Sequence, residues 1–135
     1  MIHSVLDGDL EERLRKVVER APAEVLAVYV YGSRARGSAR HGSDLDLGAL
    51  LAGPPPSTLS NVARDLEAAA EGALRIPVEV VVLNRAPADL VHRVLRDGVL
   101  VLDRDRSRRI RFEVQARNEY FDLAPLRRLY RRMPA

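Results

Sequence analysis

The chain has 135 residues, of which 47% are hydrophobic and 30% charged, and it contains no Cys and no Trp. This length suits one domain with its own core, and the lack of Cys excludes a disulfide scaffold, a thiolate nucleophile and a Cys-ligated zinc site. Residues 1–103 carry a net charge of −3 and residues 104–135 a net charge of +6, which indicates an anionic partner such as nucleic acid, a membrane surface or an acidic protein.

The N-terminal part of the chain predicts a helix followed by a strand. The first twenty residues hold no apolar stretch of the signal-peptide type, and no apolar run is long enough to span a bilayer, so we expect a soluble, cytoplasmic protein. Apolar residues at helical spacing predict a helix over residues 9–20, capped by Asp9 and ended by Pro22. Residues 25–31 are β-branched or aromatic and predict a buried strand, with Tyr29 and Tyr31 in the core.

The middle of the chain predicts a loop, a strand and a turn. The first strand ends at Gly32, and residues 32–43 are polar or small, which predicts a loop. Residues 44–51 begin with alternating carboxylates and leucines and then become apolar. This pattern predicts a strand that carries the carboxylates on one face. Residues 52–57 contain three successive prolines, which exclude both a helix and a paired strand and predict a turn.

The remaining pattern alternates between helices and strands. It predicts helices over residues 57–74 and 87–96, strands over 77–83 and 99–102, and a helix from 104 to about 132 that Pro125 interrupts. The order predicts an α/β (α+β) fold with a small mixed sheet flanked by helices. The link between the first two strands is close to the shortest that can join parallel strands. The two strands are therefore either parallel with a minimal connection or antiparallel.

Three carboxylates lie in predicted strands, where polar residues are unusual. Asp44 and Asp46 are two residues apart and therefore share one face of their strand, while Leu45 and Leu47 face the core. Neighbouring carboxylates repel each other unless a cation lies between them, and Mg²⁺ prefers such oxygen ligands. Glu79 would join them if its strand pairs with theirs. Alternatively, these residues belong to a solvated strand edge.

The segment before Asp44 favours a functional interpretation. Gly32 and Ser33 follow a strand directly, so their backbone N–H groups could form a phosphate-binding turn. Arg34, Arg36 and Arg40 could bind further phosphate oxygens. A phosphate-binding turn beside metal-binding carboxylates is what a metal–nucleotide complex requires.

The segment YGSRARGSARHGSDLDLGALL, residues 31–51, resembles the Gly-Ser-x10-Asp-x-Asp signature of the DNA polymerase β-like nucleotidyltransferase superfamily. The small size and the segment over residues 93–132 resemble the minimal nucleotidyltransferases (MNT), many of which are antitoxins of HEPN/MNT toxin–antitoxin pairs. The resemblance covers residues 10–132. It implies a polymerase β-like nucleotidyltransferase fold in a single domain over residues 1–135, with residues 104–135 as a basic C-terminal helical segment.

The resemblance also implies roles for individual residues. The nucleotide-binding residues would be Gly32, Ser33, Arg34, Arg36 and Ser43. The catalytic residues, which would also bind two Mg²⁺ ions, would be Asp44, Asp46 and Glu79. The third carboxylate is often Asp in MNT proteins, whereas this chain has Glu.

The function implied is that of an antitoxin that transfers AMP from ATP to a hydroxyl group, expected to be a tyrosine, of a cognate HEPN RNase toxin. A hetero-oligomer with that toxin is expected. Two alternatives remain: an antitoxin that acts by binding alone, which Glu79 in place of Asp favours, and a nucleotidyltransferase for a small molecule. No RNA-reading motif is present, so direct nucleic-acid binding is not expected. The basic segment is interpreted as a helix for an acidic protein partner or for packing on the domain itself.

Overall fold

The computed structural model describes residues 8–35, 44–53 and 56–122. The helices and strands follow the predicted order, with one additional 3-10 turn: α1 (Gly8–Glu19), β1 (Val25–Tyr31), β2 (Leu45–Leu51), α2 (Pro56–Leu74), β3 (Val78–Val82), η1 (Leu83–Arg85), α3 (Ala88–Asp97), β4 (Val99–Asp103) and α4 (Arg106–Asp122). Pro56, predicted in the turn, instead opens α2, because a helix leaves the first N–H groups unpaired and proline lacks one. Residues 123–132 of the last predicted helix, including Pro125, lie outside the described residues.

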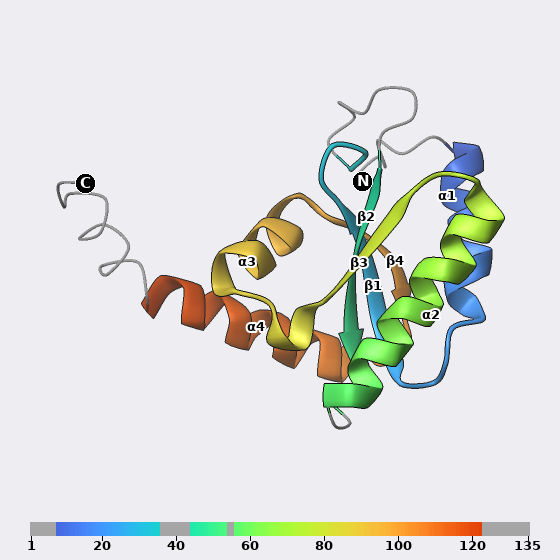
Figure 1. Ribbon diagram of the computed structural model, residues 1–135. Helices are drawn as coiled ribbons and strands as arrows, with labels where there is room; N and C mark the ends of the chain where they lie inside the picture. The colour runs from blue at the N-terminus through green and yellow to red at the C-terminus, as the bar shows by residue number, and fades with distance from the viewer. Residues whose placement is uncertain (1–7, 36–43, 54–55, 123–135) are drawn as a thin grey trace, which may run out of the picture.

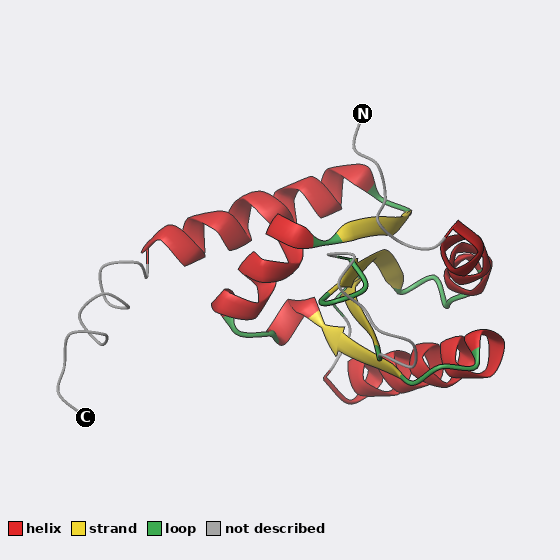
Figure 2. Ribbon diagram, turned by 90° about the horizontal axis from the view of Figure 1, so that it is seen from above, coloured by secondary structure: helices red, strands yellow, loops and turns green. Residues whose placement is uncertain are grey.

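The sheet has four strands in the order β3-β2-β1-β4 and is mixed, as predicted. Strand β1 is antiparallel to both β2 and β4, whereas β2 and β3 are parallel. Helices α1 and α2 cover one face, and α3 and α4 cover the other (Figures 1 and 2). The α+β fold class is therefore confirmed. None of the helices in the described ranges is both long and apolar enough to cross a bilayer.

Side-chain alternation along the strands produces a separate core on each face. Val28 and Val30 of β1 join Leu45 and Leu47 of β2 in the core beneath α1 and α2, and all four are fully buried. The opposite core contains Tyr29 and Leu50 from the sheet, Leu83 from η1, and Val91 and Val94 from α3. Each fully buried Leu or Val side chain contributes about 1.5–3 kcal/mol.

Arg104 fastens the end of α1 to the start of β1. Its guanidinium donates hydrogen bonds to the backbone carbonyls of Glu19 (2.8 Å), Ala21 (2.9 Å), Pro22 (2.7 Å), Val25 (3.2 Å) and Val18 (3.4 Å). The last carbonyls of a helix have no partners within it, so one planar cation satisfies several of them together. Part of the basic C-terminal segment thus holds the body of the protein together.

Replacing Arg104 by alanine should lower the free energy of unfolding by about 2 kcal/mol, because these carbonyls lose charged donors. Urea denaturation measures the change. The matched control is Arg106→Ala, which removes the same charge from an exposed position of α4 and should change stability by less than about 0.5 kcal/mol. Equal unfolding midpoints for the two variants would show that the carbonyl cluster does not stabilise the fold.

A second polar network joins α4 to the sheet. The Tyr29 hydroxyl donates to Glu113 Oε2 over 2.6 Å, and Arg109 Nη1 donates to the same oxygen over 2.8 Å. Arg109 Nε also donates to Asp103 Oδ2 at the end of β4, over 2.9 Å. Burial, together with the hydrogen bond to Glu113, raises the pKa of Tyr29 above its ordinary value of 10.0.

The raised pKa of Tyr29 predicts a pH dependence of stability. Folded Tyr29 keeps its proton where the unfolded chain has lost it, so its contribution is complete below about pH 10 and is lost as pH rises above that value. The Tyr29→Phe variant should be about 1 kcal/mol less stable at neutral pH and should lose less stability above about pH 10. Urea midpoints followed from neutral to alkaline pH check this. If the difference between variant and wild type stays constant with pH, the assignment is wrong.

Candidate functional site

Strand pairing places Tyr31, Asp46 and Glu79 in one row across three strands. Tyr31 lies opposite Asp46 in the antiparallel β1–β2 pair, and Asp46 lies opposite Glu79 in the parallel β2–β3 pair. Neighbouring strands are about 4.8 Å apart. Because Leu45 and Leu47 belong to the core beneath α1 and α2, Asp46 points to the other face, which α3 and α4 cover. The Glu79 strand pairs with the Asp strand, so the condition on which the sequence placed Glu79 beside Asp46 is met.

The backbone turns sharply at Gly32, directly after β1. Its φ is +76°, a conformation that other residues rarely adopt. A Cβ atom at this position would overlap Asp46 Oδ2, so the Asp46 carboxylate lies directly against the Gly32 backbone. Ser33 and Arg34 follow in the same turn, both half-buried. The fold thus brings together the Gly-Ser and Asp-x-Asp parts of the motif.

The other predicted site residues differ in exposure and in whether they are described. Asp44 is exposed and immediately precedes β2; Glu79 is exposed on β3, and Asp46 is half-buried. Arg36, Arg40 and Ser43 lie outside the described residues. Within residues 8–35, 44–53 and 56–122, no group of three His, Cys, Asp or Glu side chains could hold a metal ion by itself.

We call the row of Tyr31, Asp46 and Glu79 the carboxylate row. Its two carboxylates nevertheless offer a suitable donor set for a hard cation. Mg²⁺ characteristically uses one or two protein carboxylates and takes its other ligands from water and substrate phosphates. Asp46 and Glu79 occupy facing register positions, and a cation between them would relieve the repulsion of two negative charges. The residues present therefore fit Mg²⁺ that arrives with a nucleotide.

Two residues of this region were not predicted as part of a site. Burial raises the pKa of Tyr31, the charges of Asp46 and Glu79 raise it further, and Arg93 of α3 opposes them. The phenol, predicted to lie in the core, is therefore half-buried beside both carboxylates. Its position next to Gly32, at the strand end, could have indicated this. No sequence signal marks Arg93, because its position depends on how α3 packs on the sheet.

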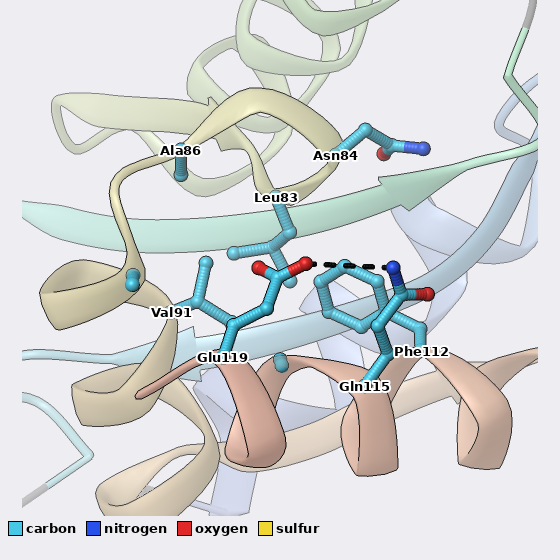
Figure 3. A pocket seen from close by; sticks show the side chains of 9 residues that line it. Leu83, Asn84, Ala86, Val91, Phe112, Gln115 and Glu119 are labelled. Atoms are coloured by element: carbon cyan, nitrogen blue, oxygen red, sulfur yellow. Dashed lines mark hydrogen bonds between the residues drawn. The ribbon is translucent and has the colours of Figure 1, made fainter. Parts of the chain in front are cut away.

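A cavity of about 190 Å³ lies elsewhere on this side of the molecule, between η1, α3 and α4 (Figure 3). Its lining includes Leu83 and Phe112, and Gln115 donates a hydrogen bond to Glu119 over 3.4 Å at its rim. Leu83 follows the end of β3, whereas Glu79 lies near the start of that strand. None of the predicted site residues lines this cavity, so it is separate from the carboxylate row.

Comparison with known proteins adds evidence of family and fold. The family model "Polymerase beta, Nucleotidyltransferase" matches residues 12–107, and no curated protein matches the chain. Three of the similar solved structures bear on the function. A toxin–antitoxin complex with AMP-PNP contains a chain that is 22% identical, with a TM-score of 0.71; the match covers 89% of this chain and 94% of that one.

The second structure is a tri-AMPylated HEPN toxin of Shewanella oneidensis in complex with an MNT antitoxin. Its matched chain is 20% identical, with a TM-score of 0.69, and the match covers 90% of this chain and 92% of that one. The third is a candidate minimal nucleotidyltransferase that is 30% identical, with a TM-score of 0.57; here the match covers 72% of this chain and 95% of that one.

Proposed function

The chain belongs to the polymerase β nucleotidyltransferase family, and from this premise we propose that it transfers AMP from ATP to a hydroxyl group of a HEPN RNase toxin. It thereby acts as the antitoxin of that protein. The observation that carries the proposal is the row of Tyr31, Asp46 and Glu79, with the Gly32 turn held against Asp46. Because the donor is ATP, the protein acts in the cytoplasm. Residues 1–135 function as one domain, with 104–135 as its basic C-terminal segment.

Two similar structures support the choice of donor and partner. One is a toxin–antitoxin complex with AMP-PNP, an analogue of ATP. The other contains an AMPylated HEPN toxin together with an MNT antitoxin. Both matched chains have the fold described above, and this chain has Gly32, Ser33, Asp44 and Asp46 at the spacing of the family signature. A protein that only binds its partner has no need of that set.

Asp44, Asp46 and Glu79 would hold two Mg²⁺ ions. Bound Mg²⁺ supplies positive charge that stabilises the oxygens of the attacking and leaving groups in an in-line displacement. The chain contributes the carboxylates that fix the cations and the Gly32 turn that keeps Asp46 in place. Arg93, whose charge acts on the same row, adds a fixed positive charge to this face.

The remaining residues orient the nucleotide and handle the proton. The N–H groups of Gly32 and Ser33 bind phosphate oxygens, and Arg34, Arg36 and Ser43 bind the leaving pyrophosphate. The acceptor hydroxyl oxygen bonds to the α-phosphorus as the bond from that phosphorus to the pyrophosphate oxygen breaks. The hydroxyl proton passes to Glu79, which is exposed and can meet an acceptor from another chain. The products are an AMP-modified toxin and pyrophosphate.

The test is to incubate the protein with the product of the gene adjacent to its own, with Mg²⁺ and each nucleoside triphosphate in turn, and to measure intact masses. We expect the partner to gain AMP with ATP, and fragmentation to locate AMP on a tyrosine. Suppression of toxicity without a mass gain would instead establish an antitoxin that acts by binding. A mass gain on an aminoglycoside but not on the partner would indicate a small-molecule enzyme.

A further inference from the structure

Helix α4 carries apolar side chains on two sides. Phe112 and Ala116 face inward and pack against the core beneath α3 and α4. Ile110, Val114 and Phe121 are also apolar, but their exposed fractions are 40%, 50% and 63%. In the described part of the chain, these three are the large hydrophobic side chains that are exposed. A helix that packed only against its own domain would be polar on its outer side.

The exposed residues form one stripe. At 3.6 residues per turn, Ile110, Val114 and Phe121 fall within about 40° of one another around the helix axis. Single exposed apolar residues are common on protein surfaces, whereas several aligned on one element mark an interaction surface. The stripe lies on the side of α4 opposite Phe112 and therefore faces away from the sheet. Figure 2 shows this outer side of α4 free of other described elements.

The arginines that the structure describes in the C-terminal segment, between residues 104 and 122, divide into two groups. Arg104, Arg108 and Arg109 point inward and donate to the backbone or to carboxylates of the body. Three others lie on the outward half of α4 and flank the stripe: Arg106, Arg111 and Arg117, all exposed. Of these, Arg117 has only a long 3.9 Å contact to Glu113. The outer surface therefore combines an apolar centre with a positive rim.

We propose that this outer surface of α4, made of Ile110, Val114 and Phe121 with Arg106, Arg111 and Arg117, is the docking surface for a partner protein that presents an apolar patch bordered by acidic side chains. The identification of that partner as the HEPN toxin rests on the proposed function. The apolar centre supplies affinity by burial, and the arginines supply orientation and attraction toward acidic side chains. The docking surface and the carboxylate row share no residues, so binding and catalysis can be changed separately.

Two variants test the surface: Val114→Asp and Phe121→Asp. Each places a negative charge in the apolar centre at an exposed position. The matched control is Ala68→Asp, which makes the same charge change at an exposed position of α2, on the opposite face of the sheet. Circular dichroism and thermal unfolding check that all three variants fold. Calorimetry measures the Kd for the HEPN toxin that serves as partner, sought in the gene adjacent to this one.

We expect Val114→Asp and Phe121→Asp each to raise the Kd at least about tenfold, and Ala68→Asp to change it by less than about twofold. Wild-type affinity should also fall as salt is added. Unchanged affinity in both stripe variants would overturn the inference. So would a wild-type chain that dimerises alone and becomes monomeric on Val114→Asp, because the occupant would then be a second copy.

AMP transfer, measured separately, distinguishes this inference from the proposed function. The stripe variants should retain kcat at saturating partner and show a raised KM. If wild type binds the partner and the stripe variants do not, but no AMP is transferred, the docking surface stands and the enzymatic proposal fails. If wild type does not bind the HEPN protein at all, the docking inference fails.

Discussion

Replacing Asp46 by asparagine is expected to abolish AMP transfer while leaving the protein folded. The two side chains have nearly the same shape, so the Gly32 turn can still pack against this residue. The substitution removes one of the two charges that face each other across β2 and β3, and with it the attraction for a divalent cation. We expect the rate to fall at least about 1,000-fold, which corresponds to ~4 kcal/mol of activation free energy.

The rate at which AMP appears on the partner, followed by intact mass, measures this effect. The matched control is Asp65→Asn, the same chemical change at an exposed position of α2, which should leave the rate unchanged. Glu79→Gln should behave like Asp46→Asn if Glu79 serves as the third carboxylate. If the rate for Asp46→Asn is within about tenfold of the wild-type rate, Asp46 does not bind the catalytic metal.

Replacing Gly32 by alanine should inactivate the protein by moving the Asp46 carboxylate. The added Cβ would overlap Asp46 Oδ2, and the φ of +76° disfavours any side chain. We expect a loss of about 1–2 kcal/mol in stability from the backbone alone. We also expect activity to fall at least about 100-fold, because small displacements of a catalytic group have effects of that size.

Gly53 provides the control for backbone strain. Its φ is +95°, but a Cβ there would meet nothing within 4 Å. Gly53→Ala should therefore lose a similar amount of stability and keep its activity. Urea denaturation and the AMP-transfer assay separate the two effects. Equal activities of the two variants would mean that contact between Gly32 and Asp46 has no part in the reaction.

The sequence pattern predicted the elements well because strong local signals marked them. The strand over residues 25–31 has the bounds of β1, since its β-branched run ends at Gly32. The short link between the first two strands left a minimal parallel connection and an antiparallel pair both open, and the structure has the antiparallel pair. The facing positions of Asp46 and Glu79 could be predicted only on the condition that their strands pair. Strand pairing depends on contacts across the whole sheet rather than on local pattern.

The site was predicted in part. The spacing identified Gly32 and Asp46, but their direct contact depends on the backbone geometry at Gly32. Tyr31 was predicted as core because its strand is apolar. It does pack against the core beneath α3 and α4, but it is only half-buried and also lies beside the two carboxylates. The net charge of the C-terminal segment could not show which arginines point inward. For α4 that division depends on the rotation of the helix about its axis, which places Arg108 and Arg109 on contacts with the body.

Asp46 and Glu79, with the Gly32 turn, should bind a nucleotide together with Mg²⁺ if the protein transfers AMP as proposed. Calorimetric titration of the isolated chain with a non-hydrolysable ATP analogue tests this most directly, because it needs no partner protein. We expect binding in Mg²⁺ that disappears when EDTA is added and is at least about tenfold weaker in Asp46→Asn. Binding of equal strength with and without Mg²⁺, and in wild type and Asp46→Asn alike, would contradict it.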